Sequence, residues 1–151
     1  MIVVFVGCNL KAQQKDTVYS NDRNLPSGFI GLSPKGDSIF RSVQTEAEFP
    51  GGPTGWRTYL TRNLNTTIAS TIPIPAGKRN GKLTLTVKFL VNKDGKISDV
   101  SVENADSFPK IFVKEAIRVI SEGPNWVPAW QDGHAAFYWT HQNITWINQP
   151  N

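Results

Sequence analysis

The sequence predicts an α+β fold in which two helices pack on one face of a three-stranded antiparallel sheet. Apolar residues recur at helical spacing over residues 54–64 and again over residues 110–121. Between them, two strand-like segments flank the turn at 92–95 and indicate a hairpin. A third strand-like segment, residues 135–147, follows the second helix. The order helix, strand, strand, helix, strand gives the fold class.

The composition is typical of a small, folded, mildly basic domain. The chain has 151 residues, of which 39% are hydrophobic and 11% aromatic, and this argues against a disordered protein. The net charge of +4 favours anionic surfaces, but no nucleic-acid-binding motif accompanies it. We therefore expect one folded domain over residues 46–151 and no nucleic acid partner.

The first eight residues resemble the end of a bacterial lipoprotein signal. A short apolar run ends in Gly7-Cys8 and is too short to span a bilayer, which takes about 20 residues. Lipidation at Cys8 would place the protein in the periplasm or cell envelope, anchored to a membrane. Two alternatives are an ordinary signal peptide cut near Ala12 and a buried strand whose thiol is inert. Cys8 is the only cysteine, so no disulfide within the chain is expected.

Residues 9–45 are polar and lack a sustained period, which is typical of a linker or a loosely ordered arm. Two apolar pairs, Phe29-Ile30 and Ile39-Phe40, offer points at which this arm can dock on the domain. Alternatively, residues 37–43 add a strand to an edge of the sheet.

The first helix is expected to begin at Pro53, because proline suits the first helical position. Its apolar face consists of Trp56, Tyr59, Leu60 and Leu64. Residues 65–81 follow as an irregular loop that packs Ile72 and Ile74 on the core, since repeated Pro and Gly oppose a regular element.

The hairpin strands are expected at residues 83–91 and 96–104. In the return strand, Ile97 has the opposite parity to Val100 and Val102. All three face the core only if a bulge lies between them, so we predict a bulge near Ser98-Asp99.

The second helix is expected to be capped by Asp106 or Ser107 and to end at Gly123-Pro124. In the last strand neither set of alternating residues is purely apolar. This pattern is typical of a strand that lies near the edge of a sheet.

Taken in order, several motifs resemble the C-terminal domain of TonB energy transducers, in particular the standalone forms of Bacteroidetes-type bacteria. None of them is diagnostic alone, and one family feature is missing, because Ile72–Pro75 stands where many members have Tyr-Pro. The motifs are Phe49-Pro-Gly-Gly52, Trp56, Tyr59-Leu60, Arg62-Asn63-Leu64, Val87–Val91, Lys93–Val100, Glu115–Ile120 and Gly123–Gly133.

The resemblance implies a periplasmic module that binds an extended peptide of an outer-membrane receptor, or of another envelope protein, by adding it to a sheet edge. The predicted groove beside the docked strand is formed by Tyr138, Thr140, Gln142 and Ile144. The alternative is ordinary sheet packing, with the edge covered by the N-terminal arm. A self-associating envelope scaffold, such as a homodimer, is the second functional hypothesis.

Other patterns favour structural roles. Trp126, Pro128 and Trp130 are typical of a helix-to-strand crossover filled by rigid rings rather than of a carbohydrate platform. His134 and His141 lack the spacing of metal ligands. No nucleophile motif or phosphate loop is present in the sequence, so we expect a non-enzymatic protein that needs no cofactor. The basic residues at 78, 79, 82, 88, 93 and 96 indicate a solvated positive face or a site for acidic groups.

Overall fold

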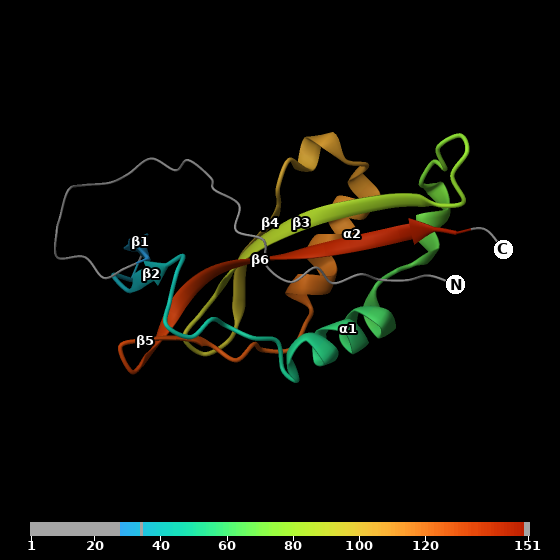
Figure 1. Ribbon diagram of the computed structural model, residues 1–151. Coiled ribbons are helices and arrows are strands. Elements are labelled where there is room, and N and C mark those ends of the chain that lie inside the picture. Colours follow the sequence, from blue (N-terminus) through green and yellow to red (C-terminus); the bar gives the residue numbers. More distant parts are fainter. Residues whose placement is uncertain (1–27, 34, 150–151) are drawn as a thin grey trace.

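The computed structural model describes residues 28–33 and 35–149 and has an α+β fold (Figure 1). The fold class is confirmed, but the prediction of a three-stranded sheet is wrong. The expected strands β3, β4 and β6 are joined by two strands from the N-terminal arm and one from the crossover. The order along the sheet is β1 (Phe29–Leu32), β2 (Ser38–Phe40), β6 (His134–Asn148), β3 (Gly81–Val91) and β4 (Ile97–Val102), and β5 (Ala129–Gln131) pairs with β6 outside that path.

Strand β3 supplies the centre of the core through its alternating apolar residues. Leu85, Val87, Phe89 and Val91 are completely buried, as the period of two predicts. Helix α1 (Gly52–Asn63) and helix α2 (Lys110–Ser121) cover this inner face of the sheet, and their apolar residues join the same core cluster (Figure 1). Helix α2 has the bounds predicted from its periodicity.

Helix α1 begins at Gly52, one residue before the predicted Pro53, which lies in its first turn; the N-cap residue, Gly51, has the left-handed conformation. Trp56, Leu60 and Leu64 are buried in the core. Tyr59 is half-buried, and its hydroxyl donates a hydrogen bond to the carbonyl of Val119 at 2.8 Å. The expected apolar face of α1 is therefore confirmed, and Tyr59 also ties α1 to α2.

An ion-pair network fixes the end of α1 against α2. The Arg118 guanidinium donates to both carboxylate oxygens of Glu115 at 2.9 and 2.7 Å, and to the carbonyl of Asn63 at 2.7 Å. The same Glu115 accepts a hydrogen bond from the backbone N–H of Asn65 at 2.7 Å. Arg118 lowers the pKa of the Glu115 carboxyl, and the bond from Asn65 adds to this effect. The network satisfies the Asn63 carbonyl, which α1 leaves free at its C-terminus, and the N–H of Asn65 just beyond the helix.

The loop after α1 differs from its prediction in two ways. It contains a short 3₁₀ helix, η1 (Thr67–Thr71), where no regular element was expected. Ile72 is buried as predicted, but Ile74 is 36% exposed, so its expected core position is wrong. The prolines limit regular structure only after η1 has ended.

The predicted bulge in the return strand is confirmed. Lys88 pairs with Ser101 and Leu90 with Ser98, so β4 carries one extra residue across from Phe89. Asp99 adopts a positive φ of 51° in this bulge. Ile97, Val100 and Val102 consequently all pack against the core.

The predicted cap of α2 is wrong. Asp106 and Ser107 lie in a separate short helix, η2 (Ala105–Ser107), and the N-cap residue of α2 is Pro109, which makes no side-chain capping bond. A fixed proline φ starts this helix instead of a side-chain acceptor.

Three segments that are far apart in the sequence meet beside the crossover between α2 and β6. The backbone of Glu48 exchanges two hydrogen bonds with Val127, at 3.0 and 2.8 Å. The N–H of Trp126 donates to the carbonyl of Gly95 at 2.8 Å. The turn before α1, the hairpin turn and the crossover are therefore one structural unit.

An aromatic group fills this meeting point, and we call it the crossover cluster: Phe49, Trp56, Phe89 and Trp126. The Trp126 ring lies 5.7 Å from the ring of Phe49 and 5.1 Å from that of Phe89 in edge-on geometry. Such pairs stabilise beyond their buried area. The structural interpretation holds for Trp126, which is 6% exposed, but Trp130 is 45% exposed and does not fill the crossover.

Candidate functional site at the edge of β6

Strand β6 is paired with β3 on one side in an unbroken register from Gly81↔Asn148 to Val91↔Tyr138. Directly opposed residues share a face of the sheet. The four residues predicted to line a groove therefore lie on the inner face, opposite the buried residues of β3. Ile144 is completely buried and Tyr138 is 5% exposed, while Thr140 and Gln142 are half-buried.

The hydrogen bonds of β3 reveal which backbone groups of β6 are already used. The carbonyl of Thr86 accepts from the N–H of Glu103 at 2.9 Å, so the backbone of Thr86 faces β4. Its neighbour Val87 must then face β6, and the opposed Gln142 must face β3, because the backbone alternates along a strand. The even-numbered residues of β6 from 138 to 146 thus bond to β3.

The odd-numbered residues of β6 direct their N–H and C=O groups to the opposite edge. They are Trp139, His141, Asn143, Thr145 and Ile147. Their side chains lie on the outer face of the sheet, because the predicted set occupies the inner face. The four predicted residues and the residues whose backbone N–H and C=O groups point away from β3 are therefore two alternating sets on β6.

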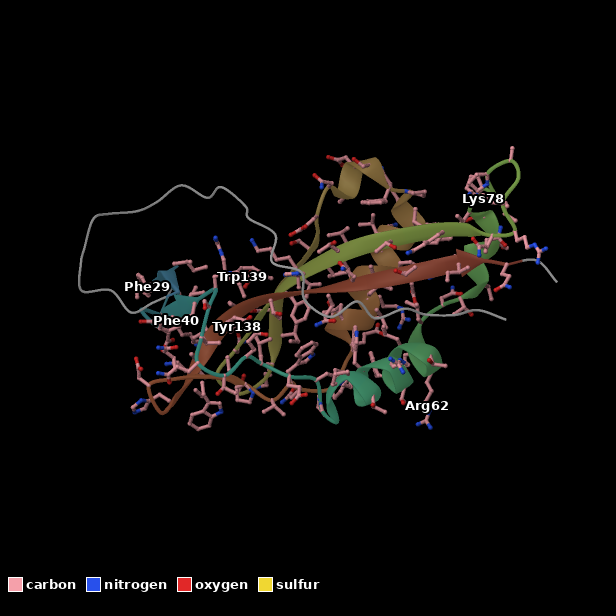
Figure 2. All side chains as sticks on the ribbon, viewed as in Figure 1. Phe29, Phe40, Arg62, Lys78, Tyr138 and Trp139 are labelled. Atoms are coloured by element: carbon pink, nitrogen blue, oxygen red, sulfur yellow. The ribbon has the colours of Figure 1, made fainter. Side chains whose placement is uncertain are left out.

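Only the first part of this edge is occupied by a strand of the described chain. Strand β2 pairs with β6 in parallel at Ile39↔Phe137 and Phe40↔Tyr138. From Trp139 to Asn148, no strand among residues 28–33 and 35–149 pairs with β6 on this side. In Figure 2, Phe29 and Phe40 mark the β1–β2 hairpin beside Tyr138 and Trp139. We call the stretch from Trp139 to Asn148 the open edge.

The hairpin is attached to the sheet by an ion pair as well as by β2. The Lys93 ammonium lies 2.6 Å from Oδ1 of Asp37 and 5.6 Å from the centroid of the Phe137 ring. The hydrogen bond from Lys93 lowers the pKa of the Asp37 carboxyl. Phe40 is buried and meets Phe29 edge-on at 6.1 Å.

Tyr138 sits where the arm, β2 and β6 meet. Burial, and to a lesser extent the nearby Glu46 carboxylate, raise the pKa of Tyr138 to about 12. A hydrogen bond to Thr140 acts in the opposite direction. Two of the four predicted residues are thereby coupled to each other and to the start of the domain.

We expect this shift to be visible as an alkaline loss of stability. A tyrosine in the unfolded chain titrates near 10, so the folded state keeps its proton to higher pH. The contribution of Tyr138 is therefore complete below about pH 10 and falls as the pH rises toward 12, by at most about 3 kcal/mol. Urea unfolding of the wild type and of Tyr138→Phe over this range measures it. A difference between the two proteins that stays constant from pH 9 to 12 would contradict the assignment.

The basic residues noted in the sequence do not form one patch. Lys96 forms an ion pair with Asp94 at 3.0 Å, and Lys93 forms one with Asp37 of the β1–β2 hairpin. Lys88 places its ammonium 5.0 Å from the centroid of the Trp139 ring, on the outer face. The other three, Lys78, Arg79 and Lys82, are exposed. Figure 2 shows Lys78 at the opposite end of the sheet from the β1–β2 hairpin, and Lys82 pairs with Ile147 near the end of β6.

A metal cluster and a membrane-spanning helix were also sought among residues 28–33 and 35–149. They contain no group of three or more His, Cys, Asp or Glu side chains placed to hold a metal ion. Within the same residues no helix is both long and apolar enough to cross a membrane. The signal-like segment and Cys8 lie outside the residues that the structure describes.

The sequence comparison decides the family. Residues 73–147, about half of the chain, match the model of the family described as "Gram-negative bacterial TonB protein C-terminal". The chain belongs to the TonB C-terminal domain family. It is thus a TonB-like domain of the bacterial cell envelope. Comparisons with curated proteins and with solved structures gave no significant match.

The family segment begins after α1, yet α1 is part of the same core. The matched residues contain β3, β4, α2, β5 and nearly all of β6. Phe49, Trp56 and Leu60 lie before the segment but pack in the cluster that its strands and second helix form. The TonB-like domain of this protein therefore extends at least from Glu48, whose backbone bonds to Val127, into β6.

Proposed function

We propose that this protein is a non-enzymatic binding module of the periplasm that takes up an extended peptide of an envelope partner by strand addition to the open edge of β6. The observation that carries the proposal is the set of odd-numbered β6 residues whose backbone groups face that edge. An incoming strand satisfies such groups through main-chain hydrogen bonds. In the TonB-like setting, the proposed partner is a segment of an outer-membrane receptor or of another envelope protein.

Strand β2 supports this proposal because it already uses the edge in the same manner. Its pairing with Phe137 and Tyr138 shows that the backbone of β6 on this side accepts a parallel strand. A partner strand then has positions from Trp139 onward in which to pair; the side chains of Trp139, His141 and Asn143 are partly exposed there, whereas those of Thr145 and Ile147 are buried.

The predicted groove residues keep a part in this proposal. Thr140 and Gln142 are half-buried on the inner face, and their side chains flank a docked strand from that side. Tyr138 and Ile144 are buried, so they act by holding β6 in position rather than by broad contact with the partner.

A proline at His141 tests the use of the edge. The N–H of His141 faces the open edge, so its loss should cost only about 1 kcal/mol in folding, as for prolines on free edges. The same change should abolish binding, because the ring removes one donor and blocks the approach of a strand. Thr140→Pro is the contrasting variant: it removes a bond to β3 and should destabilise by about 2 kcal/mol or more.

The measurement is capture from a bacterial envelope extract with the full chain, followed by identification of the bound peptide and by NMR of the labelled protein with that peptide. We expect the amides of the odd-numbered residues from 139 to 147 to gain protection from hydrogen exchange, and the even-numbered ones to stay as they were. A folded His141→Pro protein that captures the same partner equally well would refute strand addition.

Self-association as an envelope scaffold is the second candidate, because a second copy can occupy the same edge. The exposed apolar side chains of β1, Ile30 at 40% and Leu32 at 62%, favour such contact. Sedimentation over a range of concentrations separates the two functions. A homodimer that His141→Pro dissociates, with no partner captured, would favour the scaffold.

A further inference from the structure

The contact between the β1–β2 hairpin and the sheet has a simple chemical form. A lysine from the β3–β4 hairpin turn, Lys93, reaches over an aromatic ring of β6, Phe137, and binds a carboxylate. That carboxylate belongs to Asp37, which immediately precedes β2, the strand added to β6. Backbone pairing and an acidic side chain are thus combined where β2 adds to β6.

The same arrangement recurs at the start of the open edge, without the carboxylate. Lys88 lies opposite His141 in the register but leans over Trp139, with its ammonium 5.0 Å from the ring centroid. Its ammonium is therefore held against a side chain of β6, on the outer face of the sheet. Among the described residues no carboxylate forms an ion pair with Lys88.

The surroundings of Lys88 are compatible with an anionic partner. The outer face beside it carries the hydroxyl of Thr86, which donates to the Asn143 side chain at 2.8 Å, and the imidazole of His141. Asp99 and Glu103 belong to β4 or follow it, on the far side of β3 from the edge, and Asp37 is already bound by Lys93. Lys82 extends the positive charge toward the other end of the open edge.

We propose that the strand received by the open edge carries an acidic side chain on its outer face, and that Lys88, held over Trp139, selects it. This inference rests on the strand addition proposed above and adds the chemistry of the partner. The partner is an extended peptide with Asp or Glu at one outward position, bound by Lys88 as Asp37 is bound by Lys93. Trp139 positions the ammonium through its ring face.

The test uses the full chain and three synthetic peptides. Each has ten residues that alternate threonine and valine, and one central threonine is replaced by glutamate, glutamine or lysine. Dissociation constants are taken from the amide shifts of Trp139, His141 and Asn143 in NMR titrations at low salt. We expect the glutamate peptide to bind about threefold to fivefold more tightly than the glutamine peptide, as for a partly exposed ion pair, and the lysine peptide most weakly.

Variants of two lysines on the same strand separate the possible sources of that preference. Lys88→Gln should remove the preference for glutamate, and Lys88→Arg should retain it. Lys82→Gln is the matched control on the same face of β3 and should retain it as well. Salt should reduce the preference in the wild type and leave Lys88→Gln unaffected.

The outcomes distinguish this inference from the function on which it rests. Equal binding of the glutamate and glutamine peptides at the edge would overturn the role of Lys88 and leave strand addition intact. A preference that persists in Lys88→Gln would also overturn it. If no peptide shifts the edge amides, both strand addition and the acidic partner are refuted.

Discussion

Trp126→Ala should cost about 3–5 kcal/mol of the free energy of unfolding, the range found for large aromatic residues removed from cores. The ring is 6% exposed and contacts the rings of Phe49, Trp56 and Phe89 at centroid distances of 5.7, 6.0 and 5.1 Å. Its removal leaves a cavity among three residues that come from the turn before α1, from α1 and from β3. These elements are too rigid to close it fully.

Trp130→Ala is the matched control. Trp130 lies four residues further along the same crossover and is 45% exposed. Its structural contact with Thr45 is made by the backbone, in two hydrogen bonds of 2.9 and 3.1 Å that alanine retains. We expect a loss below about 1 kcal/mol, as for most exposed positions.

Urea unfolding followed by far-UV circular dichroism measures both variants without relying on tryptophan fluorescence. Equal losses for the two tryptophans would show that the crossover cluster is not a principal stabilising element. If the cluster is as important as its contacts indicate, the Trp126 variant should also weaken the attachment of the segment around Glu48, seen as faster exchange of the Glu48 and Val127 amides.

Local signals in the sequence were sufficient for the helices and for the hairpin. The 3.6-residue period of α2 gave its bounds, and the parity of Ile97 against Val100 required the bulge that β4 has. Both are decided by neighbours in the chain. The prediction of the α2 cap was wrong, although Asp106 and Ser107 are suitable capping residues, because they lie in a separate short helix, η2, before α2 begins.

The non-local pairings were not available from the sequence. Strand β2 is three residues long and pairs in parallel with a strand about 100 residues later in the chain, so no local period marks it. The residues 37–43 were recognised as one option for an added strand, but not its partner or direction. Strand β5 is equally short and was assigned to the crossover.

The edge of β6 shows where sequence reasoning about the site ends. The strand and its mixed polarity were evident, but which alternating set directs its backbone outward depends on the register with β3. That register follows from tertiary packing of Leu85, Val87 and Phe89 against the helices. The pairing of Lys88 with Trp139 depends on it as well, because the two residues are 51 positions apart and meet only across the strands.

Gly95→Ala should destabilise the protein by about 3 kcal/mol or more, although it adds only one methyl group. Gly95 has a φ of 80°, and a Cβ there would lie 2.0 Å from the carbonyl oxygen of Trp126 and 3.1 Å from its carbonyl carbon. Both contacts are with backbone, so no side chain can rotate away. Relief requires the hairpin turn and the crossover to separate, which breaks the 2.8 Å hydrogen bond from the Trp126 N–H to the Gly95 carbonyl.

Gly133→Ala isolates the conformational part of this effect. Gly133 has a similar φ of 77° in the turn between β5 and β6, but no atom lies within 4 Å of the position a Cβ would take. Alanine there should cost only the left-handed backbone strain, about 1–2 kcal/mol. The difference between the two variants in urea unfolding reports the steric contact alone. Equal losses would mean that the turn can move away from Trp126 without cost. The conformation of the Asn-Lys-Asp-Gly turn would then depend on its own glycine and not on the contact with the crossover.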